Sequence, residues 1–153
     1  MPLKNLNINQ LLNLVAATAL LMAFVVLGSY YGSLPKIIPI HFNAQGIADG
    51  FGNKSTLWVV PVLAFLMCLG LFQLNRSLPK IKPNIENKEY ITLTRVNSIL
   101  SLLVALSFSY ITIRSVYIAT TGSGGLGSWF LPVFCISFIV GPIIPLILHR
   151  KMS

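Results

Sequence analysis

The chain has 153 residues, of which 55% are hydrophobic and only 9% are charged, and its formal net charge is +8. Soluble domains carry about 25% charged residues, so this composition excludes an ordinary water-soluble domain and indicates a membrane protein. The basic residues lie between long apolar runs, which favours anionic lipid headgroups as their partner and argues against nucleic acid.

Four apolar segments are each long enough to cross a bilayer, which takes about 20 mostly apolar residues. They occupy residues 11–31, 56–74, 96–119 and 129–148. Each span is expected to be helical, because lipid satisfies no backbone hydrogen bonds and four strands cannot close a barrel. The predicted fold is an all-α integral membrane protein, a four-transmembrane-helix bundle with a structured outer loop between helices 1 and 2.

The first apolar segment could also be interpreted as a signal peptide. Its apolar stretch is long, however, and no small-x-small cleavage site follows it between Gly28 and Ser33. We therefore expect this segment to remain as the first membrane span.

The outer loop, residues 32–55, has the pattern of a shaped segment. Pro35 and Pro39 stop the first helix and favour extended backbone. The β-branched and aromatic stretch 37–42 fits either a short strand or a segment lying on the bilayer surface. Gly46 and the pair Asp49-Gly50 are turn signals.

A long motif in this loop resembles a known family. It reads Leu34-Pro35-x-x-Ile38-Pro39-x-His41-Phe42-Asn43-x-x-Gly46-x-x-Asp49-Gly50, with Lys54 ahead of a Trp- and Pro-bearing helix. The pattern is similar to the bacterial domain of unknown function 1648, the N-terminal part of SdpI-type membrane proteins. The resemblance extends to about residue 75 and implies a membrane location. It also implies immunity to a secreted peptide, although four expected spans are fewer than the six of the immunity protein.

The polar residues of the outer loop define the predicted binding site. A zinc site needs three or four His, Cys or carboxylate ligands, and this side of the chain offers one His and one acid. No nucleophile signature accompanies them, so we expect no catalytic residue, no metal and no cofactor. The alternative is that these residues only hold the loop together. The predicted set is Pro39, His41, Asn43, Gly46, Asp49 and Lys54.

The connection 75–95 carries five basic residues, and Pro79 and Pro83 are expected to prevent a long helix there. Lys and Arg concentrate on the cytoplasmic side of membrane proteins. Eight lie on the side of this loop and the termini: Lys4, Arg76, Lys80, Lys82, Lys88, Arg95, Arg150 and Lys151. Only Lys36 and Lys54 lie in the outer loop. We therefore expect a multi-pass protein of the inner or plasma membrane with both termini and the loop 75–95 in the cytoplasm.

The third segment carries small residues at four-residue spacing, Ser101, Ala105 and Ser109, which favours packing inside the bundle, with homodimerisation as the alternative. It also contains Arg114 near its outer end. This arginine could extend to the membrane interface, or it could pair with Asp49 and clamp the outer loop onto the third helix.

The remaining elements give simpler expectations. Residues 122–125, which read Gly-Ser-Gly-Gly, are expected to form a flexible connector. A kink or an early end is predicted in the fourth helix from four residues that disfavour a straight helix: Pro132, Gly141, Pro142 and Pro145. Cys68 and Cys135 are expected to be small buried hydrophobic residues, not a disulfide or metal pair.

These features favour a non-catalytic recognition, immunity or sensing protein that acts through its outer loop. Its partner would be an extracellular peptide or another membrane protein. The alternative is a small transporter or a transporter accessory subunit. Ionisable groups inside the spans would favour that alternative.

Overall fold

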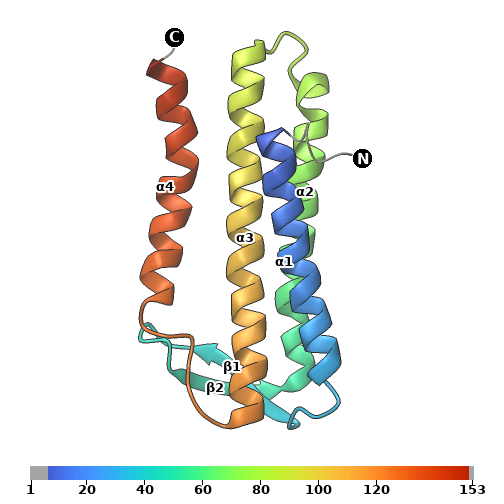
Figure 1. Cartoon of the computed structure of the whole chain (residues 1–153), viewed down its shortest axis with the longest axis vertical. Helices are drawn as coiled ribbons and strands as arrows, with labels where there is room; N and C mark the ends of the chain where they lie inside the picture. The colour runs from blue at the N-terminus through green and yellow to red at the C-terminus, as the bar shows by residue number, and fades with distance from the viewer. Residues whose placement is uncertain (1–6, 152–153) are drawn as a thin grey trace.

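The computed structural model describes residues 7–151 and contains four long helices and one β-hairpin (Figure 1). The helices are α1 (Ile8–Tyr30), α2 (Val59–Ile81), α3 (Asn87–Thr121) and α4 (Phe130–Lys151). The antiparallel strands are β1 (Ile37–Phe42) and β2 (Ala48–Asn53), followed by the short 3-10 helix η2 (Lys54–Trp58). We call the two ends of the bundle the hairpin end and the termini end. Lys4 and the side chains of His149 and Lys151 lie outside the described residues.

Four helices are long and apolar enough to span a membrane, as the sequence predicts. Their outward faces carry large apolar side chains such as Leu21, Leu66 and Ile139, each more than half exposed. Because water would penalise so much apolar surface, these faces suit a lipid environment.

The fold differs from the all-α prediction by its β-hairpin, and the helices extend beyond the apolar segments. The predicted loop 75–95 is mostly helical, because α2 continues through Pro79 to Ile81 and α3 already begins at Asn87. Pro79 lies in the last turns of α2, where the loss of one backbone hydrogen bond does not end the helix. The ion pair between Lys82 and Glu89, at 2.7 Å, joins the connection to α3.

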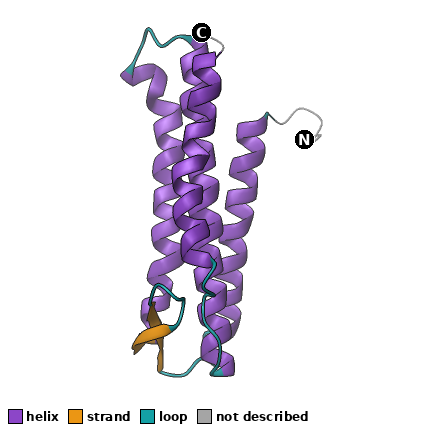
Figure 2. Ribbon diagram, turned by 90° about the vertical axis from the view of Figure 1, so that its left-hand side faces the viewer, coloured by secondary structure: helices purple, strands orange, loops and turns teal. Residues whose placement is uncertain are grey.

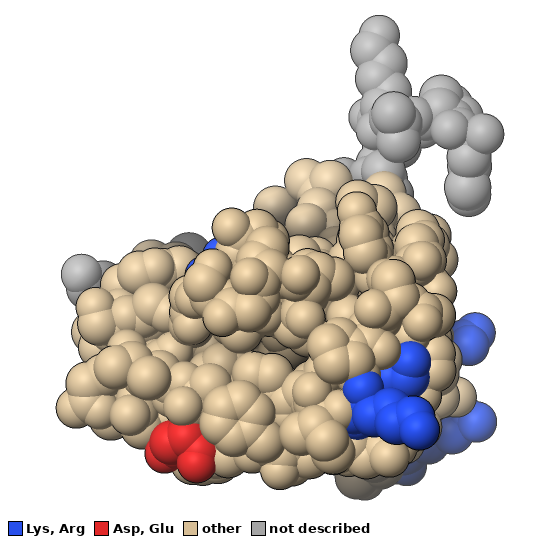
Figure 3. All heavy atoms as spheres, turned by 90° about the horizontal axis from the view of Figure 1, so that it is seen from below, with Lys and Arg blue, Asp and Glu red and all other residues tan. Residues whose placement is uncertain are grey.

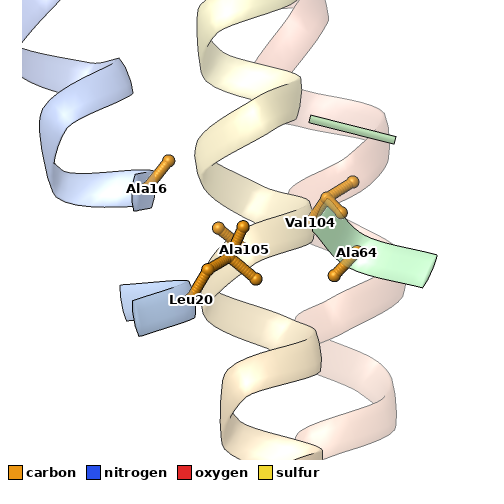
Figure 4. Packing of buried hydrophobic residues seen from close by; sticks show 5 residues of the cluster. All are labelled: Ala16, Leu20, Ala64, Val104 and Ala105. Atoms are coloured by element: carbon orange, nitrogen blue, oxygen red, sulfur yellow. The ribbon is translucent and has the colours of Figure 1, made fainter. Parts of the chain in front are cut away.

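The core of the bundle lies where α1 and α2 pack on α3. Ala16 and Leu20 of α1 and Ala64 of α2 meet Val104 and Ala105 of α3 (Figure 4). The small-residue positions of α3 are buried there, and the hydroxyl of Ser109 donates to the carbonyl of Ala19 at 2.9 Å. This confirms that these residues pack inside the bundle, where small side chains allow close helix approach.

Helix α4 stands on the other side of α3 from α1 and α2 (Figure 1). It continues through Pro142 and Pro145, so the predicted early end of this helix is wrong. Cys135 of α4 is exposed, contrary to expectation, whereas the half-buried Cys68 thiol donates to the carbonyl of Ser101 at 3.4 Å. Both cysteines are free thiols.

The hairpin closes one end of the bundle, opposite the termini (Figure 2). A second apolar cluster anchors it there through Leu27, Leu34, Ile38, Leu57 and Val116, which come from α1, β1, η2, α3 and the α1–β1 connection. Aromatic side chains pack against this cluster, with the Tyr31 and Trp58 rings 5.7 Å apart. The hairpin is therefore part of the packed structure.

Candidate functional site

The hairpin turn is built by Asn43 and Gly46. The Asn43 side chain accepts hydrogen bonds from the backbone N–H groups of Gln45 and Ile47, both at 3.0 Å. Gly46 adopts a φ of +74°, which favours glycine because it has no Cβ. Two of the predicted binding residues therefore shape the turn, and the stretch 37–42 is a strand.

The predicted turn at Asp49-Gly50 is wrong, since both residues lie within β2. Gly50 is needed there because an added Cβ would lie 2.8 Å from the Cβ of His41 across the hairpin. Gly52 likewise leaves room for Ile40, whose Cδ1 would lie 2.5 Å from an added Cβ. These glycines allow the side chains of β1 to cover β2.

The side chains of His41 and Asp49 form a hydrogen bond across the hairpin, with Nδ1 and Oδ1 2.5 Å apart. Their side chains are 71% and 42% exposed, and an exposed pair contributes only about 0–1 kcal/mol to stability. The pair is therefore accessible to a ligand and is not a main support of the fold. Pro39, by contrast, is buried in β1 just before an irregularity in the strand register.

Lys54, the first residue of η2, joins η2 to the end of α1. Its Nζ donates to the backbone carbonyls of Tyr31 at 2.9 Å and Leu34 at 3.0 Å, and it lies 4.8 Å from the centre of the Tyr31 ring. The last carbonyls of a helix lack partners within the helix, so Lys54 satisfies the end of α1 from the start of η2. This predicted binding residue is a structural clamp.

The connection 122–129 is attached to the hairpin tip. The Leu126 N–H donates to the carbonyl of Gly46 at 2.8 Å, and the hydroxyl of Tyr110 donates to the carbonyl of Leu126 at 2.7 Å. A Cβ added at Gly46 would lie within 2.7–2.9 Å of the Gly127 backbone. This connection is therefore attached to the hairpin through Leu126 and Gly127, while the expectation that residues 122–125 are flexible stays a prediction.

Arg114 clamps this second connection, not the hairpin. Its Nε donates to the carbonyl of Gly125 at 3.1 Å, its Nη2 bonds the same oxygen, and its guanidinium lies 5.0 Å from the centre of the Tyr117 ring. The predicted pairing with Asp49 is wrong, because Asp49 pairs with His41. Arg114 is therefore linked to the hairpin through Gly125 and its neighbour Leu126.

A hollow of about 310 Å³ lies between the hairpin tip, the second connection and the start of α4. It is mostly apolar, with polar groups from His41 and Asn43. Its lining includes His41, Phe42, Asn43, Leu126, Phe130 and Leu131. Such a combination suits a ligand that buries an apolar side chain and makes a few polar contacts.

The hairpin also presents apolar side chains to its surroundings. Ile37, Ile47 and Phe51 are 61%, 60% and 64% exposed. Seen from the hairpin end, most of the surface is uncharged, and basic and acidic atoms lie apart on it (Figure 3). Within residues 7–151, no three His, Cys, Asp or Glu side chains gather closely enough to hold a metal ion.

Sequence reasoning missed the second side of this site, which Leu126, Gly127 and Phe130 provide. The available signal was the pair Trp129-Phe130 directly after a glycine-rich run. The two rings pack against Tyr110 of α3, at 5.2 Å and 5.0 Å between ring centres. This packing holds the connection beside the hairpin.

These features define a class: a four-helix protein of membrane-spanning character whose one end is closed by a clamped β-hairpin. The family described as domain of unknown function (DUF1648) matches residues 18–65, which run from α1 through the hairpin into α2. Residues 18–65 are therefore similar to this domain, as the motif between residues 34 and 54 predicts. No curated protein and no solved structure matches the chain.

Proposed function

We propose that the chain is a non-catalytic membrane protein that recognises an extracellular peptide or membrane protein through its hairpin end. The observation that carries this proposal is the hollow of about 310 Å³ beside a hairpin whose outward apolar side chains are exposed. Exposed apolar surface next to a concave site is typical of a binding surface. The clamps at Lys54 and Arg114 keep this surface in shape.

The proposed orientation places the hairpin outside and the termini in the cytoplasm of a cell membrane. Most Lys and Arg residues of the described helices lie toward the termini end, and short cytoplasmic segments of membrane proteins are rich in these residues. The hairpin end then meets whatever arrives from outside the cell. The resemblance of the domain to SdpI-type proteins supports immunity or sensing as the outcome of that recognition.

A small transporter is the alternative, and the interior of the bundle gives it less support. Several buried hydroxyls of α3 already donate to helix carbonyls, as Ser98 does to Thr94 and Thr112 to Phe108. Arg114, the ionisable residue of the third apolar segment, bonds the second connection. Transport pathways usually place ionisable groups deep in the spans.

The test is complementation of a deletion strain challenged with secreted peptides from culture supernatants. Phe51→Ser changes an exposed hairpin side chain, and His41→Ala removes the exposed pair; both should abolish protection or signalling at an unchanged membrane level. Ile81→Ser is the matched control, since Ile81 is 68% exposed at the termini end. Full protection by both hairpin variants would refute recognition through this surface. Equal loss of protein level would instead favour a purely structural function.

A further inference from the structure

The termini end contains a polar hollow of about 470 Å³ between α1, α2 and α3. Arg76 of α2 and Arg95 of α3 contribute two positive charges to its lining, and Asn9, Asn13 and Asn75 contribute side-chain amides. None of its lining residues is an Asp or a Glu. The nearby acid Glu89 is already paired with Lys82. The hollow is therefore cationic and suited to an anion.

Two buried polar atoms of this lining have no hydrogen-bond partner within the described part of the chain: Arg95 Nε and Asn9 Oδ1. Two neighbouring amides are bonded: Asn9 Nδ2 donates to the Thr94 hydroxyl at 3.2 Å, and Asn97 Nδ2 donates to Asn75 Oδ1 at 2.7 Å. A buried polar group without a partner destabilises the fold. A ligand that satisfied both atoms would accept a hydrogen bond from Arg95 Nε and donate one to Asn9 Oδ1.

An apolar groove of about 430 Å³ continues from this hollow along the bundle between α1 and α2. Asn13 and Phe72 line both spaces, so they mark the junction. Ala16 and Ala17 leave room along α1. The Arg76 guanidinium lies 5.5 Å from the centre of the Phe72 ring, directly at the point where polar lining gives way to apolar lining.

We propose that the hollow and the groove together bind one anionic phospholipid whose headgroup also carries hydroxyl groups. The phosphate lies between Arg76 and Arg95, because guanidinium groups bind phosphate oxygens with paired, charge-assisted hydrogen bonds. A headgroup hydroxyl donates to Asn9 Oδ1. One acyl chain follows the groove toward the middle of the bundle, which a free phosphate ion could not fill. Basic pockets between membrane helices bind lipid headgroups in this way.

The test compares phosphatidylglycerol with phosphatidylcholine of the same acyl chains, each titrated into the purified full chain in detergent and followed by native mass spectrometry. Phosphatidylglycerol should bind more tightly. Arg95→Gln and the exposed-site variant Arg76→Gln should each weaken that binding about ten- to hundredfold. Lys80→Gln is the matched control, because Lys80 is an exposed cation of the same helix outside the hollow. It should bind like the unchanged chain.

Two further arms separate a lipid from a free anion. Ala17→Phe fills the groove without touching the arginines, and it should weaken phosphatidylglycerol binding. Inorganic phosphate alone should leave the thermal unfolding temperature unchanged at lipid-equivalent concentration. Equal binding of both lipids, or equal loss of binding in Lys80→Gln, would overturn the proposal. So would stabilisation by phosphate alone together with unchanged lipid binding in Ala17→Phe. The result is independent of the hairpin, which lies at the other end.

Discussion

The two ends of the bundle use their positive charges differently. At the hairpin end, Lys54 and Arg114 donate to backbone carbonyls and hold the chain in place. At the termini end, Arg95 keeps a buried Nε without a partner among the described residues, and Arg76 lies against an aromatic ring. Lys54 and Arg114 therefore stabilise the fold, whereas Arg76 and Arg95 are the cations that the proposed lipid would bind.

The comparison shows that residue type and position along the chain do not reveal the use of a charge. Lys54 and Arg114 lie at the ends of apolar segments in the same way as Arg76 and Arg95. What separates them is the supply of unpaired carbonyls. The end of α1 and the second connection present such carbonyls to Lys54 and Arg114.

The largest effect is expected for Gly46→Ala. An added Cβ would meet the Gly127 backbone at 2.7–2.9 Å, and the φ of +74° strains any other residue. We expect a loss of about 2–5 kcal/mol in the free energy of unfolding, measured by thermal unfolding in detergent. Gly122→Ala is the control, because it has a φ of +69° with nothing within 4 Å, and it should lose only about 1–2 kcal/mol. Equal losses would mean that the close packing of the hairpin turn against the connection 122–129 does not contribute to stability.

Lys54→Met should have the next largest effect. The substitution keeps most of the apolar stem but removes both hydrogen bonds to the carbonyls of Tyr31 and Leu34. We expect a loss of about 1.5–3 kcal/mol, the usual worth of hydrogen bonds to a charged group. Lys36→Met removes an exposed lysine of the same region and should change stability little. If Lys54→Met left the free energy of unfolding unchanged, the hydrogen bonds of Lys54 would contribute nothing to stability.

Arg114→Gln should cost about 1–3 kcal/mol, because the carbonyl of Gly125 loses its partner. The same variant combined with Asp49→Asn should lose the sum of the two single effects within about 0.3–0.5 kcal/mol. Additivity is expected because Asp49 pairs with His41 and not with Arg114. A coupling well above this range would restore a direct link between Arg114 and the hairpin.

His41→Ala should have the smallest effect on stability, below about 1 kcal/mol, because its hydrogen bond with Asp49 is exposed. Thermal unfolding in detergent is again the measurement. A larger loss would place His41 among the supports of the fold, together with Lys54, and would weaken its assignment to the recognition surface.

The helices could be predicted from the sequence because apolar length is a local property. Residues 56–74 lie in η2 and α2, and residues 129–148 lie in α4 except for the first. The ends of the helices could not be predicted from the same signal. The polar residues after 74 do not stop α2, and Pro79 near its C-terminal end is tolerated.

The candidate site could be predicted only in part. Asn43 and Gly46 carry a local turn signal, and the turn forms there. The docking of Leu126 onto Gly46 joins residues 80 positions apart in sequence, and nothing in residues 122–125 reveals it. From its position alone, Arg114 was expected either to extend to the membrane interface or to pair with Asp49. In the structure it bonds the carbonyl of Gly125 instead.

The orientation of the hairpin end tests the proposed recognition most directly. Phe51→Cys and Ile81→Cys, each in a chain with Cys68→Ala and Cys135→Ala, would be treated in intact cells with a membrane-impermeant maleimide. Both side chains are exposed, at opposite ends of the bundle. We predict labelling of Phe51→Cys in intact cells and of Ile81→Cys only after permeabilisation. The reverse pattern would place the hairpin in the cytoplasm and contradict recognition of an extracellular partner.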